Sequence, residues 1–153
     1  MGCFQVFEDH EGIEADIRRR LAGLGGGPEA RSSGQRPALL VVSPRAALRS
    51  PITAACRTAL LPGDPPLAQL ALQAASAVSY GSGPRNTLTL SSMEGERAAV
   101  AVQREFSSLG GLLVERQELV LAYDGGPPDL FLARVGAALL LGLAGTDKGE
   151  AAR

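Results

Sequence analysis

The chain has 153 residues, of which 45% are hydrophobic and 20% are charged, and its formal net charge is −1. This balance predicts one globular domain with a core, and the lack of a polybasic surface argues against nucleic acid or a membrane as a partner. The longest apolar run, residues 137–144, is far too short for a bilayer, which takes about 20 residues. No secretory leader opens the chain, so we expect a soluble cytoplasmic protein.

An amphipathic helix is predicted within residues 1–24. Four apolar side chains recur there at helical spacing and form one stripe: Ile13, Ile17, Leu21 and Leu24. Residues 25–36 are rich in Gly, Ser and Pro and are predicted to be a flexible linker. The stripe therefore either packs on the chain's own domain or binds a protein partner, and the linker permits both outcomes.

The main α/β domain is expected over residues 37–145, and its first half is predicted to be a parallel sheet. Residues 38–42 and 57–61 are apolar runs without alternation, which is typical of strands buried on both faces. Residues 46–55 form the crossover between them. Asp64 is a good N-cap for a helix whose inner face holds Leu67, Leu70, Ala71 and Ala74. A third strand over residues 76–80 follows.

The second half is predicted to be a three-stranded antiparallel meander over residues 87–91, 98–104 and 112–121. Short turns join these runs, and their apolar and polar residues alternate. A final helix over residues 129–143 should cover the sheet with Leu132, Val135, Leu139 and Leu143 and should be capped by Gly145. Residues 146–153 read as a disordered tail. The predicted class is α/β.

The order of these elements resembles the second half of the central domain of Mur-type peptide ligases. The resemblance covers roughly residues 60–143. It is carried by Val78-Ser79-Tyr80-Gly81 with Pro84 following, and by Ala137-Ala138 with Leu141-Gly142-Leu143. The resemblance implies a shared fold.

The chain departs from that family at the residues that carry its chemistry. The family's ATP site needs a Gly-rich loop ending in Gly-Lys-Thr, whereas the only lysine here is Lys148. The family also carries a Gly-x-His-Asn stretch where this chain reads Gly125-Gly126-Pro127-Pro128. No ligase residue can be carried over, and we predict that the protein does not use ATP.

A ligand site is predicted where the parallel strands end, because open α/β sheets bind ligands at the carboxyl ends of their strands. The loop at Gly81 could form an amide-lined nest for an anion. Seven residues at this edge are the candidates for binding a phosphate, a carboxylate or a nucleotide-like anion: Ser43, Arg45, Arg49, Ser79, Tyr80, Ser82 and Arg85. The alternative is a tight turn, solvated arginines and a packing tyrosine.

Catalytic residue types are scarce. His10 is the only histidine, and a nucleophilic Cys56 would need it as a base across the linker. Cys3 and His10 are too few for a metal site, so we expect neither a metal nor a cofactor. Two functions remain open. One is a non-catalytic module that binds a protein partner through the N-terminal helix. The other is a binding protein or enzyme for a small anionic ligand.

Overall fold

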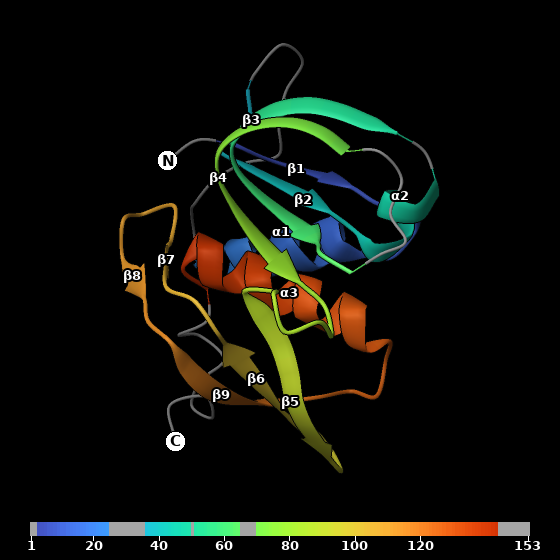
Figure 1. Cartoon of the computed structure of the whole chain (residues 1–153), viewed down its shortest axis with the longest axis vertical. Coiled ribbons are helices and arrows are strands. Elements are labelled where there is room, and N and C mark those ends of the chain that lie inside the picture. Colours follow the sequence, from blue (N-terminus) through green and yellow to red (C-terminus); the bar gives the residue numbers. More distant parts are fainter. Residues whose placement is uncertain (1–2, 25–35, 50, 65–69, 144–153) are drawn as a thin grey trace.

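The predicted α/β class is confirmed. The computed structural model describes residues 3–24, 36–49, 51–64 and 70–143. Their strands form a seven-stranded sheet in the order β1-β2-β3-β4-β5-β6-β9 and a separate β7–β8 pair (Figure 1). The main sheet comprises β1 (Phe4–Phe7), β2 (Leu39–Val42), β3 (Ile52–Pro62), β4 (Leu70–Tyr80), β5 (Leu88–Glu94), β6 (Arg97–Val102) and β9 (Gln117–Ala122). The other elements are β7 (Phe106–Ser107), β8 (Leu113–Val114), α1 (Ile13–Leu24), α2 (Pro44–Arg49) and α3 (Pro128–Leu141).

The sheet changes from parallel to antiparallel after β5. Strands β1 to β5 are parallel neighbours, although β4 and β5 pair only at Tyr80 and Leu88. Strands β5, β6 and β9 are antiparallel neighbours in chain order. The predicted change of character beyond Gly81 is therefore confirmed, and β5 is the strand at which the direction switches.

Strand β2 is buried on both faces, as its continuous apolar run predicts. Leu39 and Val41 belong to the larger core, which α1 and α3 cover. Leu40 and Val42 belong to a second core with Ala47 of α2 and residues of β3. In Figure 1, β3 and β4 are long curved strands that arch over β1 and β2. The second face of β2 is thus covered mainly by the sheet's own curvature.

The prediction of a helix after Asp64 is wrong for residues 70–74, the part of that segment that the structure describes. Leu70, Ala71 and Ala74 lie in β4, which pairs with β3 from Ile52↔Leu70 to Pro62↔Tyr80. Leu67 lies outside the described residues. The helical spacing was misleading because a long ladder with a neighbouring strand can override local preference. Leu70 and Leu72 pack on the second core, and their period of two is the pattern of a strand.

The N-terminal helix is confirmed, since α1 spans Ile13–Leu24. Ile13, Ile17 and Leu21 are buried in the chain's own core, while the side chain of Leu24 is not described. The Glu8 carboxylate accepts hydrogen bonds from the first two helical N–H groups, at 2.8 and 3.0 Å. Strand β1, which precedes this cap, was not predicted. Most of the predicted linker and the whole predicted tail lie outside the described residues.

The third predicted meander strand is only partly correct. Its first residues belong to β8, which pairs with β7 rather than with β6. Its last residues form β9, which pairs with β6 as predicted. Glu115 and Arg116, where the strand direction breaks, separate the two. A run of strand-like residues does not by itself reveal such an interruption.

Helix α3 lies against the sheet and ends earlier than predicted. Gly142, in the left-handed conformation at φ 76°, caps it in place of Gly145. Leu132 and Leu139 are buried as expected, whereas Val135 is only half-buried. No described helix is both long and apolar enough to cross a membrane.

Candidate functional site

Six of the seven predicted edge residues, all except Arg85, form hydrogen bonds or ion pairs with other parts of the chain, and five of these six fall into two groups. In the first group, the Ser43 hydroxyl accepts a hydrogen bond from the Ala46 N–H at 3.0 Å and thereby caps α2. The Arg45 guanidinium donates to the Asp9 carbonyl at 3.3 Å, and the Arg49 guanidinium pairs with the Asp9 carboxylate. These contacts join α2 to the loop between β1 and α1.

The second group surrounds Asp64. Its carboxylate accepts hydrogen bonds from the Ser82 N–H and hydroxyl, from the Gly83 N–H at 3.0 Å and from the Asn86 amide at 2.8 Å. The loop at Gly81 is therefore an amide-lined nest, and the anion in it is the chain's own. Ser79 belongs to the same loop contacts, because its hydroxyl accepts from the Thr87 N–H at 3.2 Å. Arg85 is exposed.

Tyr80 is fully buried, and its hydroxyl donates to the Val42 carbonyl at 2.7 Å. Burial, with smaller effects from Asp129 and Glu11, raises the pKa of Tyr80 well above its usual range. The hydroxyl therefore stays protonated and serves as a cross-strand link. This contact matches the predicted alternative of a packing residue.

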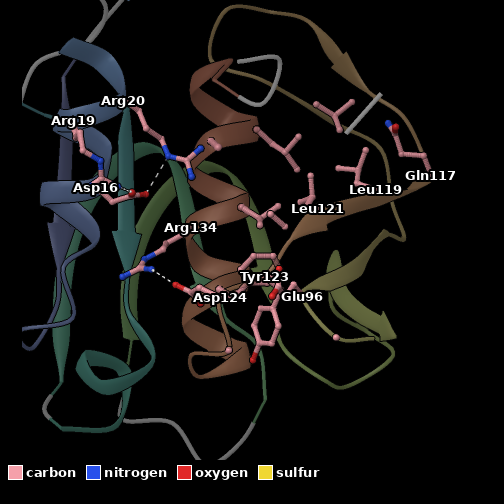
Figure 2. A pocket seen from close by; sticks show the side chains of 18 of the residues that line it. Asp16, Arg19, Arg20, Glu96, Gln117, Leu119, Leu121, Tyr123, Asp124 and Arg134 are labelled. Atoms are coloured by element: carbon pink, nitrogen blue, oxygen red, sulfur yellow. Dashed lines mark hydrogen bonds and ion pairs between the residues drawn. The ribbon is translucent and has the colours of Figure 1, made fainter. Parts of the chain in front are cut away.

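A different part of the molecule holds a large hollow. A groove with a volume of about 990 Å³ lies between α1, α3 and β9. Figure 2 shows side chains from these elements pointing into the hollow. We call it the α1–α3–β9 groove.

The walls of the groove come from two regular patterns. Helix α3 contributes residues on one face, with spacing i, i+3, i+4, i+7 and i+8: Phe131, Arg134, Val135, Ala138 and Leu139. Strand β9 and the residue after it contribute the alternate side chains Leu119, Leu121 and Tyr123. The rings of Tyr123 and Phe131 meet edge to face, with 5.0 Å between their centres. Leu113 and Val114 of β8 add a further apolar wall.

Three arginines lie on the side of the groove formed by α1 and α3. Asp16 is buried between two of them: it pairs with Arg19, and one of its oxygens is 3.3 Å from Nε of Arg20. Arg134 reaches toward α1 from α3 (Figure 2). Glu96 and Asp124 line another part of the groove. The side near α1 is therefore rich in guanidinium groups.

Arg134 is incompletely satisfied. Its Nη1 lies 4.0 Å from the Asp124 carboxylate, a distance at which the ion pair is weak. Its Nη2 donates to the Glu11 carbonyl at 3.3 Å. Its Nε is buried and has no acceptor among the described residues. A guanidinium carries five donors, and because Nε is shut off from the groove, a further anionic partner would have to meet the terminal nitrogens of Arg134.

The groove has the size and lining of a small-molecule binding site, and its residues form no catalytic arrangement. An apolar hollow of this size with a few polar groups is typical of small-molecule sites. In the described part of the chain, no group of three or more His, Cys, Asp or Glu side chains is placed to hold a metal ion. The groove residues themselves show no paired nucleophile and base.

Reasoning from the sequence did not identify this groove, because one wall, α1, is more than 100 residues from α3 in the sequence. Asp16 and Arg134 line one groove only because of the fold. One signal was present: α3 is apolar on nearly all sides, and a helix of that kind is normally covered all round. Here one face remains half-buried.

Comparisons with known proteins give no match among family models, curated proteins or solved structures.

Proposed function

We propose that this protein is a non-catalytic binding module that holds a small amphipathic anion in the α1–α3–β9 groove. The apolar body of the ligand would lie along Leu119, Leu121 and Val135, and its anionic group would meet Arg134. The proposal rests mainly on one observation: the guanidinium of Arg134, whose ion pair with Asp124 is long at 4.0 Å, lies beside the apolar wall that α3 and β9 form in the groove. It places the ligand away from the predicted sheet edge and retains the predicted ligand charge.

The size and chemistry of the groove support this ligand class. Its volume of about 990 Å³ is at the upper end of the range for drug-sized ligands, about 300–1,000 Å³. A hydrogen bond between a guanidinium and a carboxylate, with charge on both partners, is stronger than one to a neutral group, so the site should favour an acid over the corresponding alcohol. Removal of apolar ligand surface from water would supply the remaining affinity.

Binding can be measured with a dansyl-labelled medium-chain carboxylic acid, compared with the corresponding alcohol. The chain has no Trp, so dansyl emission is free of tryptophan background. We expect the acid to bind and the alcohol to bind about tenfold more weakly, which corresponds to about 1.4 kcal/mol. Equal affinities would contradict the role of Arg134, and no emission change with either probe would contradict the proposal.

Matched variants locate the site. Arg134→Gln should lower the affinity for the acid about tenfold and leave the affinity for the alcohol unchanged, whereas the exposed Arg97→Gln should change neither affinity.

A second pair of variants tests the apolar part of the site. Leu119→Asp, which places a charge in the groove, should lower the affinity for both probes. Leu48→Asp is the control, because Leu48 is 57% exposed on α2. Far-UV circular dichroism establishes that each variant is folded. Equal losses in Leu119→Asp and Leu48→Asp would show that the probes bind elsewhere.

A further inference from the structure

Strand β9 is an outermost strand of the main sheet, and its outer edge pairs with no other strand in the described part of the chain. The N–H of Tyr123 donates to the Glu96 carbonyl of the neighbouring chain segment at 2.8 Å. In an antiparallel ladder, alternate residues direct both backbone groups to the same neighbour. Residues 117, 119 and 121 therefore face β6, while Glu118, Val120 and Ala122 point their N–H and C=O groups away from the sheet.

This edge has few of the features that usually prevent pairing with another chain. Protected edges carry charged residues, especially lysine, or proline or a bulge, or are very short. Strand β9 spans six residues, contains one charged residue (Glu118) and neither lysine nor proline, and pairs with β6 without a register shift. Val120 is 38% exposed on it. The other outermost strand, β1, has four residues, and none of its side chains is exposed. The β9 edge is thus the better template for a further strand.

The sequence of β9 is complementary to itself in one antiparallel register. With a two-fold axis at Val120, all three outward-facing residues find partners: Val120 opposite Val120, and Glu118 opposite Ala122. The same register brings Arg116, which immediately precedes β9 in one copy, to the same end as Asp124, which follows β9 by two residues in the other, and both side chains are exposed. Opposite charges across a strand pair are favourable, and like charges are not. A register centred on Glu118 would instead place two carboxylates face to face.

We propose that two copies of this chain associate through β9, antiparallel and centred on Val120, to form one continuous sheet. This inference does not rest on the proposed ligand. Leu119 of each copy then lies opposite Leu121 of the other, on the face that carries the groove. The two grooves consequently adjoin across the two-fold axis.

The test is the molar mass of the full chain, measured by light scattering during size-exclusion chromatography. We expect twice the mass of one chain at micromolar concentration. Val120→Pro should give the mass of one chain, because proline removes an outward N–H that has no partner within the sheet. Val120→Thr keeps that N–H and should remain dimeric. A wild-type protein with the mass of one chain would overturn the proposal, as would a dimeric Val120→Pro.

A charge exchange tests the register. Arg116→Asp and Asp124→Arg should each raise the dimer dissociation constant several-fold, because each puts like charges opposite one another. The double variant restores both pairs and should recover the wild-type constant within about twofold. A double variant weaker than either single variant would overturn the register centred on Val120.

Discussion

At the scale of single residues, Asp64 shows how the chain fills its own anion site. Desolvation raises the pKa of its carboxyl, but hydrogen bonds from Ser82, Asn86 and Gly83 outweigh it, so the pKa lies below its ordinary value. Gly83 leaves no room for change, because a Cβ there would lie 2.7 Å from an Asp64 oxygen. The nest is therefore built around this carboxylate.

We expect Asp64→Asn to destabilise the protein by about 1–3 kcal/mol at neutral pH, since it removes charged hydrogen bonds. The folded pKa is depressed, so the stabilisation is fully present above the unfolded pKa, near 3.8, and is lost as pH falls through the folded pKa. Urea unfolding at pH 7 and at about pH 2.5 should show the loss shrinking in acid. A loss that is independent of pH would contradict this account. The exposed Glu94→Gln is the control.

At the scale of elements, α1 is held by its own domain. Ile17 is 2% exposed within the larger core. Replacement of a buried Ile by Ala costs about 2–5 kcal/mol, so Ile17→Ala should lower the midpoint of thermal unfolding clearly. The exposed Arg18→Ala, on the next residue, should leave the midpoint nearly unchanged. An unaffected midpoint in Ile17→Ala would mean that the helix adds little to this fold.

Helix α3 approaches the sheet closely at Gly136. A Cβ at that position would lie 2.8 Å from Leu60 and 3.1 Å from Leu88, and both leucines are fully buried. Overpacking typically costs about 1–3 kcal/mol, so Gly136→Leu should destabilise the protein by that amount, although leucine favours a helix. Val135→Leu, on the groove side, should be tolerated. Chemical unfolding of the two variants measures the difference, and equal stabilities would place α3 further from the sheet.

The same elements show which parts of the fold can be predicted from local sequence patterns and which cannot. The stripe of Ile13, Ile17 and Leu21 identified α1, because a helix is specified by residues near in sequence. The interval from Leu70 to Ala74 fitted a helix equally well, yet its ladder with β3 decides that it is a strand. The groove could not be predicted for the same reason: Arg134 and Asp16 line one groove only after long-range packing.

At the scale of the whole molecule, Tyr80 at the end of β4 links this strand to β2 across β3. Its ring belongs to the larger core, and its hydroxyl donates to the Val42 carbonyl. The Tyr80 hydroxyl is not exposed to solvent while the core is intact. Ionisation of Tyr80 should therefore require the core to open, which makes this phenol a reporter of global unfolding.

The pKa of Tyr80 is raised in the folded state, so stability should fall as pH rises above the unfolded value near 10, where only the unfolded chain loses the proton. Tyr80 and Tyr123 are the only tyrosines. In a Tyr123→Phe variant, tyrosinate absorbance should thus rise together with the loss of far-UV circular dichroism during alkaline titration. Absorbance that rises while the dichroism is intact would show that Tyr80 reaches solvent in the native state. Adding Tyr80→Phe removes this titration and should extend the native range to higher pH, while the loss of the hydrogen bond to the Val42 carbonyl should cost about 1–3 kcal/mol.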